Sequence, residues 1–231
     1  SLDASNTGTS GVTTGATALT ITADAASGNL TVDAAALADN TALTLSGGAN
    51  GKTATVNNLA GDLVATGLVS ALTVNLVDNA GDDDISVTTG SHTTSITGSI
   101  SGDTVSVIAT ALADDAVLST AGAGAFTITD LKGDLNNTAT GAVSVTLADN
   151  AGGTYTVTSD QAITVVNGTA ATGDTITLAG IGTKTVTGLV ANLSLDASNT
   201  GTTGVTTGAT ALTITADALA GNLTVDAAAL A

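Results

Sequence analysis

The chain repeats its own beginning near its end. Residues 194–231 match residues 1–38 at all but three positions, where the pairs are Ser10/Thr203, Ala26/Leu219 and Ser27/Ala220. The period is 193 residues, so the 231-residue chain holds one long repeat and a 38-residue overlap. Similarity at a fixed period is typical of arrays in which each unit packs on its neighbours. We therefore interpret residues 1–231 as a single continuous repetitive segment.

A weaker repeat divides the long one. Residues 71–81 resemble residues 142–152, and a more distant relative begins at residue 192. The sub-units therefore start near residues 71, 142 and 192, with spacings of 71, 50 and, to the next copy, 72 residues. These spacings divide into three, two and three coils of about 24 residues.

Apolar residues alternate with Thr, Ser or Asn in many short runs. Examples are Leu72/Val74/Leu76, Val143/Val145/Leu147 and Ile176/Leu178. A period of two places one set of side chains inward and the other outward, as in a half-buried β-strand. The runs recur every ten to twelve residues or so and are separated by turn signals such as Asn50-Gly51. The pattern predicts an all-β protein.

The composition favours a thin core. The apolar fraction is 43% but the aromatic fraction is 1%, with one Phe and one Tyr. Glu, Arg and Pro are absent, while Thr, Val, Gly and Asn are abundant, which disfavours helices and favours strands joined by tight turns. Large aromatic rings usually dominate a thick core. Short aliphatic side chains suit closely spaced backbones instead.

Two all-β architectures fit this spacing. The first is a β-solenoid resembling a parallel β-helix, with about eight coils of ~24 residues in each 193-residue repeat. The alternative is a string of tandem β-sandwich domains, two in each repeat. A sandwich core about 10 Å thick needs larger residues than this chain provides, and no shift in composition marks a domain boundary. We predict the solenoid.

The charge balance excludes several partners. The net charge is −17 with only three lysines, so no basic patch exists to bind nucleic acid or an anionic membrane surface. No apolar run reaches the ~18 residues of a transmembrane segment. Residue 1 is not Met and no signal peptide is recognisable, so we expect an excerpt of a longer chain or a processed product. Neither end carries a distinct polar cap, which suits the interior of a continuous filament.

Calcium is the most plausible ligand. Carboxylates cluster at Asp78, Asp82, Asp83 and Asp84, and oxygen-rich clusters suit this hard cation. The alternative interpretation is a solvated acidic turn. Asp114/Asp115 and the turn at Asp149-Asn150 are weaker candidates for the same ion. No other cofactor is expected.

The catalytic and ice-binding patterns are weak. Residues 47–53 approach a phosphate-binding loop but lead into a strand pattern rather than a helix. The only histidine, His92, stands beside Ser91 in a turn-like segment, which indicates an exposed turn residue rather than a catalytic triad. Thr-x-Thr triplets such as Thr20-Ile-Thr22, Thr127-Ile-Thr129 and Thr175-Ile-Thr177 recur, but their spacings do not fall on one coil period, so an ice-binding face is a less favoured prediction. We expect no enzymatic activity.

The Ala/Thr/Gly/Val/Asp-rich composition and the long repeat resemble those of bacterial secreted repetitive proteins. The phrases LTVDAAAL, GDTITLAG and LVDNAGDDDISV are similar in style to giant adhesins, surface-layer proteins and RTX-like β-solenoids. Gly81–Ile85 also satisfies the end of the RTX calcium-binding nonapeptide (G-x-D-x-U). The resemblance implies export to the medium or cell surface, often with calcium.

These observations predict a structural role. We expect a building block of an extracellular filament, sheath or adhesin stalk, whose partners are neighbouring repeats or subunits of the same kind. The alternative is an adhesin that binds a host, sugar or mineral surface through one face and attaches the cell to it.

Overall fold

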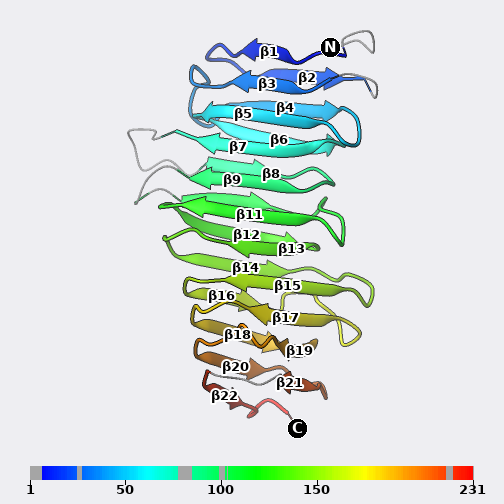
Figure 1. Ribbon diagram of the computed structural model, residues 1–231, viewed down its shortest axis with the longest axis vertical. Helices are drawn as coiled ribbons and strands as arrows, with labels where there is room; N and C mark the ends of the chain where they lie inside the picture. Colours follow the sequence, from blue (N-terminus) through cyan, green and yellow to red (C-terminus); the bar gives the residue numbers. More distant parts are fainter. Residues whose placement is uncertain are drawn as a thin grey trace.

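A computed structural model describes residues 7–24, 28–77, 85–98, 102, 104–216 and 221–230. These residues form 22 β-strands and no helix. The strands stack in sequence order along one axis, with the N-terminus at one end and the C-terminus at the other (Figure 1). The prediction of an all-β solenoid is therefore confirmed.

The strands alternate between two parallel sheets of 11 strands each. The odd-numbered strands form one sheet, here the odd sheet: β1 (Ser10–Thr13), β3 (Leu30–Asp33), β5 (Thr53–Leu59), β7 (Ala71–Leu76), β9 (Thr94–Gly98), β11 (Val117–Gly122), β13 (Asp134–Asn137), β15 (Thr154–Ser159), β17 (Thr175–Ala179), β19 (Asn192–Leu195) and β21 (Ile214–Ala216). The even-numbered strands form the other, here the even sheet: β2 (Leu19–Ala23), β4 (Ala42–Gly47), β6 (Asp62–Leu68), β8 (Ile85–Thr88), β10 (Thr104–Ile108), β12 (Ala125–Leu131), β14 (Val143–Leu147), β16 (Ile163–Val166), β18 (Lys184–Leu189), β20 (Thr203–Thr207) and β22 (Leu223–Asp226).

Each coil contributes one strand to each sheet, but the coils differ in length. Leu30 pairs with Ala54, a step of 24 residues, whereas Leu118 pairs with Leu135, a step of 17. Leu135 then pairs with Val157, a step of 22. The expected coil length of about 24 residues is therefore the upper end of these steps between paired residues, which run from 17 to 24. The strands set the stacking distance, while the turns between them absorb the insertions and deletions.

The apolar residues that alternate with Thr, Ser and Asn in the sequence are the residues whose side chains are buried. In β7 the burial changes residue by residue, with Leu72 and Val74 inside and Thr73 at the surface. The inward Val, Ile, Leu and Ala side chains of both sheets form one hydrophobic core. The two aromatic residues, Phe126 and Tyr155, are the largest fully buried side chains in that core.

Two strand ends, at Gly47 and Gly122, require glycine. Gly122 ends β11 with φ of 96°, and a Cβ on it would lie 1.7 Å from the carbonyl oxygen of Gly98 on the coil below. Gly47 ends β4 in the same way, against Ala23. Both a positive φ and the close approach of stacked backbones require glycine there.

The two copies of the repeated segment lie on opposite sheets. The first copy places β1 and β3 in the odd sheet, whereas the second places the equivalent strands, β20 and β22, in the even sheet. The step from β1 to β20 is 19 strands, which is an odd number, so one 193-residue repeat spans nine and a half coils. The related segments at residues 71 and 142 behave likewise, because β7 is in the odd sheet and β14 in the even sheet.

Candidate functional site

The predicted calcium ligands Asp78, Asp82, Asp83 and Asp84 lie outside the described residues, between β7 and β8. Within the described ranges, no three His, Asp or Glu side chains come together as a metal site. The weaker candidates are placed by the structure. Asp114 accepts a hydrogen bond from Asn150 Nδ2, and Asp149 accepts one from the backbone N–H of Ala151 at 2.9 Å. Asp149 therefore caps its own turn, whereas Asp114 links its turn to the turn at Asn150.

A buried tyrosine and a buried aspartate link the turn that precedes β15 to the turn that precedes β17. Tyr155 in β15 donates to the carbonyl oxygen of Ala148 and, at 3.3 Å, to Asp174 Oδ2. Asp174 is fully buried and also accepts from the N–H groups of Gly152 (2.7 Å) and Ala171 (2.8 Å). Burial, followed by the nearby Asp174 carboxylate, raises the pKa of the Tyr155 phenol. The phenol stays protonated and closes a turn, because its proton is needed for these hydrogen bonds.

Lys184 is the most unusual residue of the interior. It begins β18, its side chain is fully buried, and its Nζ donates to the carbonyl oxygens of Gly180, Gly182 (2.9 Å) and Ser159 (3.0 Å). Burial lowers the pKa of this amine to about 8, while Asp160 acts in the opposite direction. Its three donors match three carbonyls of two adjacent coils, so its role is to join them.

Sequence reasoning did not single out Lys184, although a signal was present. In the run Lys184-Thr-Val-Thr the lysine shares the inward face with Val186. A charged residue at an inward position of a strand pattern is rare unless it is satisfied inside.

A polar ladder runs through the interior at one corner of the coils. Thr120 Oγ1 donates to Asn137 Oδ1 at 2.8 Å, and Asn137 Nδ2 donates to Ser159 Oγ at 2.9 Å. The three residues come from β11, β13 and β15, the successive strands of the odd sheet. Because each side chain bonds the coil above or below, the ladder fixes the register between coils.

Hydroxyl groups form a column on the outer face of the even sheet. The column follows the strand pairing through six successive strands, β8 to β18: Ser86, Ser106, Thr127, Ser144, Thr164 and Thr185. Neighbouring members are separated by the interstrand distance of about 4.8 Å. Uneven coil lengths hide the column in the sequence, so irregular spacing of Thr-x-Thr triplets does not exclude an ordered hydroxyl face.

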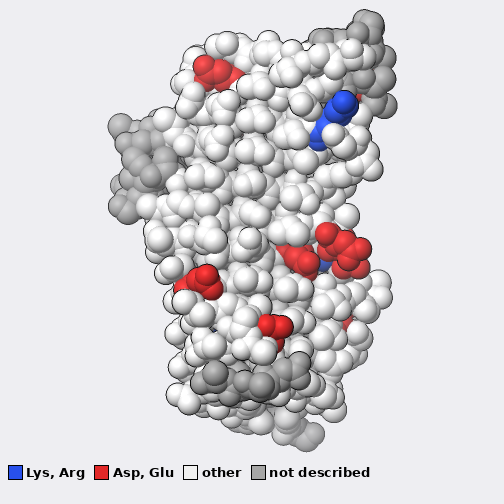
Figure 2. Space-filling model, in the orientation of Figure 1, with Lys and Arg blue, Asp and Glu red and all other residues white. Residues whose placement is uncertain are grey.

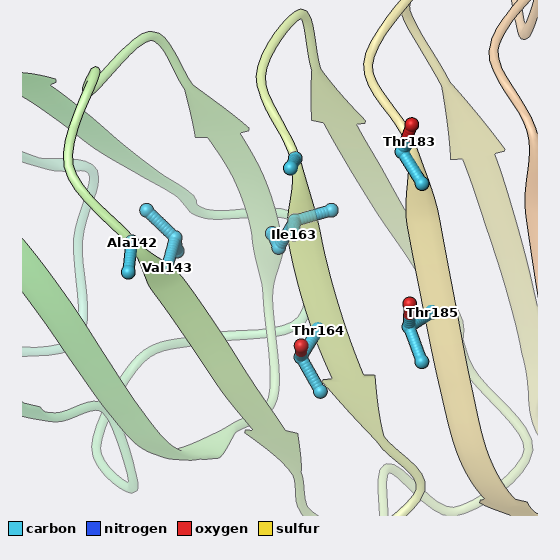
Figure 3. A pocket seen from close by; sticks show the side chains of 7 residues that line it. Ala142, Val143, Ile163, Thr164, Thr183 and Thr185 are labelled. Atoms are coloured by element: carbon cyan, nitrogen blue, oxygen red, sulfur yellow. The ribbon is translucent and has the colours of Figure 1, made fainter.

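Beside this column the even sheet has an open hollow of about 200 Å³. It is lined by residues of β14, β16 and β18 and of the turns before them, including Ala142, Val143, Ile163 and Thr164 (Figure 3). Small-molecule pockets usually enclose 300–1,000 Å³. The hollow is a dip between strands, left where small residues such as Ala142 precede them.

The odd sheet carries a second column: Thr31, Thr55, Thr73, Ser95, Ser119, Asn136 and Thr158. An open hollow of about 310 Å³ lies beside its last members, lined in part by Asp134, Asn136 and Thr156. Asp134 Oδ1 accepts a hydrogen bond from the Thr156 N–H at 2.7 Å, so its carboxylate is occupied by the neighbouring coil.

The charges are sparse on the face that Figure 2 shows, where broad areas between the acidic side chains are neutral. Of the aspartates in the strands, Asp130 is the next-to-last residue of β12, and the others stand at the first or last position of their strand: Asp33, Asp62, Asp134 and Asp226. The middle of each sheet therefore presents mainly hydroxyl and methyl groups.

The structure adds little support for the two weak catalytic patterns at Ser91/His92 and at residues 47–53. Ser91 Oγ lies 3.0 Å from His92 Nδ1, its chain neighbour, and His92 is half-buried rather than exposed as expected. The phosphate-loop-like residues 47–53 run from the last residue of β4 through a turn to the first residue of β5, so they join two strands. A strand start lacks the converging N–H groups that a helix N-terminus offers an anion.

Comparison with protein-family models, curated proteins and solved structures finds no match to this chain. The part of the chain that the structure describes contains no helix with the length and hydrophobicity of a membrane-spanning segment.

Proposed function

We propose that this protein is a structural building block of an extracellular filament, sheath or adhesin stalk. One observation carries the proposal: both sheets continue through 11 strands each, and the repeated segment re-enters the same stack after 193 residues. In such a stack each coil contacts only its neighbours, so length grows without a larger core. The role is mechanical rather than catalytic.

The extracellular, bacterial setting is supported by the resemblance of the sequence to secreted repetitive proteins. The net charge of −17 would keep a long fibre soluble and would limit side-by-side association. Surface labelling of intact producer cells with an antibody against the chain tests the location. Labelling that appears only after the cells are broken would contradict it.

Fibre diffraction and electron microscopy test the filament itself. A concentrated, aligned sample should give a reflection at about 4.8 Å along the fibre axis, because the strands run across that axis. Particles that remain single short rods at every concentration, with no end-to-end association, would contradict self-assembly.

Calcium remains a proposal for Asp78, Asp82, Asp83 and Asp84. Oxygen ligands close in sequence suit the ion, and a bound ion would raise the melting temperature by mass action. Melting curves with calcium and with a chelator, for the natural chain and for Asp82→Asn, measure this. An unchanged transition in the natural chain removes calcium from the structure.

A second function, surface binding by an adhesin, is favoured by the two hydroxyl columns. A flat, regular array of hydroxyl groups can match a solid with a repeating surface, such as a crystalline polysaccharide, a mineral or ice. Thr164→Lys interrupts the even-sheet column, and Thr73→Lys interrupts the odd-sheet column as its matched control. Adsorption to microcrystalline polysaccharide or inhibition of ice recrystallisation should fall in one variant only. No adsorption by the natural chain would eliminate this function.

A further inference from the structure

The chain contains two Asn-Gly pairs, Asn50-Gly51 and Asn167-Gly168. Each lies in a turn that leads from a strand of the even sheet to the next strand of the odd sheet, from β4 to β5 and from β16 to β17 (Figure 1). The glycine of each pair has a positive φ, 77° at Gly51 and 60° at Gly168. The two pairs therefore occupy similar places in their coils, and their surroundings can be compared directly.

The turn at Asn50 is open. Asn50 and Gly51 are both exposed, and a Cβ on Gly51 would meet nothing within 4 Å. A hydrogen bond from the Lys52 N–H to the Ala49 carbonyl oxygen, at 3.1 Å, spans the turn. Among the described residues, none forms a hydrogen bond with the Asn50 side chain or with the Gly51 N–H. These two groups can therefore move toward each other without losing a partner.

The side chain of Asn167, in contrast, is held on both sides. It is 2% exposed, and its Nδ2 donates to the Ala170 carbonyl oxygen at 2.7 Å. Its Oδ1 accepts from the N–H groups of Val190 (3.0 Å) and Ala191 (3.1 Å) on the next coil. A Cβ on the following glycine would lie 2.0 Å from the carbonyl oxygen of Leu147, so the backbone of this turn is packed against the preceding coil.

We propose that Asn50 is a site of spontaneous deamidation in the folded protein, whereas Asn167 is protected from the same reaction. The Gly51 backbone nitrogen loses its proton to water and forms a bond to Cγ of Asn50, the Cγ–Nδ2 bond breaks, and ammonia leaves. Water then opens the resulting succinimide at either of its carbonyls, which gives aspartate or isoaspartate. Glycine favours the attack because no side chain shields its nitrogen, and the two reacting groups belong to one short segment.

The surroundings of the two pairs decide where the reaction occurs. The side-chain carbon and the next backbone nitrogen must rotate toward each other. At Asn50 this rotation breaks no side-chain hydrogen bond, and water has access to the turn. At Asn167 it breaks the three hydrogen bonds of the side-chain amide and moves a packed backbone. We therefore expect deamidation at Asn167 only after unfolding.

The products also differ in their effect on the fold. A carboxylate at position 50 stands in an exposed turn, two residues from the exposed Lys52, and leaves the core of the coil unchanged. A carboxylate at position 167 loses the donor to Ala170 and becomes a buried charge. Each deamidated Asn50 therefore adds one negative charge to a chain that stays folded. The proposal concerns the chemistry of one turn and does not rest on the filament function.

Tryptic mapping measures the two sites separately, because the lysines place them in different peptides. Asn50 precedes Lys52, whereas Asn167 lies between Lys132 and Lys184. The folded natural chain and the chain in concentrated guanidinium chloride are incubated at mildly alkaline pH, and mass spectrometry follows the replacement of the amide nitrogen by oxygen. In the folded chain Asn50 should deamidate many-fold faster than Asn167. In guanidinium chloride the two rates should agree within a few-fold, because neither pair is then protected.

Asn50→Gln is the matched control, since glutamine can react in this way only through a larger and slower-forming ring. It should abolish the change in the peptide that ends at Lys52. Asn50→Asp should melt at the temperature of the natural chain, whereas Asn167→Asp should melt at a lower one. Equal rates at the two sites of the folded chain, or no deamidation of Asn50 there, overturn the proposal. Undiminished deamidation of the first peptide in Asn50→Gln assigns the reaction to another asparagine and overturns it as well.

Discussion

Lys184 offers a direct test of the buried corner between two coils. Its pKa of about 8 lies some 2.5 pH units below its ordinary value of 10.5, chiefly because the side chain is buried. At ~1.4 kcal/mol per pH unit, the charged amine costs the folded state about 3 kcal/mol at neutral pH. The cost disappears as the folded amine loses its proton, so the free energy of unfolding should rise with pH above about 8.

The expected rise is measurable. Between about pH 7 and pH 9.5 the unfolded chain binds more protons than the folded chain, and the difference integrates to about 2 kcal/mol of added stability. Tyr155 acts in the opposite direction as the pH rises through 10, because the unfolded phenol ionises there and the folded phenol, whose pKa is raised, does not. Up to pH 9.5 the contribution of Lys184 is therefore the larger one.

Lys184→Met removes the charge and the three hydrogen bonds together. The Ser159 carbonyl keeps the N–H of Gly182 at 3.1 Å, but the carbonyls of Gly180 and Gly182 lose the ammonium. That loss costs about 1–3 kcal/mol for each carbonyl, which roughly offsets the about 3 kcal/mol recovered from the charge. The variant should be at most about 3 kcal/mol less stable at neutral pH, and its stability should not rise toward pH 9.5. Urea unfolding at both pH values measures this, with Lys52→Met at an exposed position as the control. A natural chain whose stability is flat or falls over this interval refutes the reasoning.

Three further predictions concern the coils themselves. Leu37→Ala should cost about 2–5 kcal/mol by leaving a cavity, whereas Leu230→Ala, its counterpart in the second copy, which is 43% exposed in the 231-residue chain, should cost less than about 1 kcal/mol in urea unfolding; equal losses would show that both residues are covered alike. Gly122→Ala should lower the melting temperature far more than Gly51→Ala, because both have positive φ but a Cβ collides with backbone only at Gly122; similar shifts would mean that φ alone matters. Asn137→Ala breaks the polar ladder and should lower the free energy of unfolding by about 1–3 kcal/mol. Hydrogen exchange of the neighbouring backbone amides should also accelerate. Unchanged exchange would show that the ladder does not fix the register between coils.

Much of the fold was predictable because strand alternation is a local property. Runs such as Leu72/Val74/Leu76 place every second residue inside whatever the neighbouring coil is, so the strands and the all-β solenoid follow from them. The coil length was less predictable. Glycine turns of different lengths return the chain to the same stacking position, so steps of 17 and 24 residues are equivalent in space.

The candidate sites were harder to predict, since they depend on which coils meet. Asn137 gives no sign in the sequence that it lies between Thr120 and Ser159, and the six-member hydroxyl column follows a pairing that the uneven coils conceal. Lys184 could have been found from its inward position, but its three carbonyl partners come from a turn and from the preceding coil.

The sequence by itself determined that the chain is a stack of strands with a thin aliphatic core and a repeated segment at each end. Only the tertiary structure decided that one repeat contains an odd number of strands, so that identical segments lie in opposite sheets. The reason is geometric: strand formation depends on alternation over a few residues, whereas the choice of sheet depends on the count of all the strands that precede it.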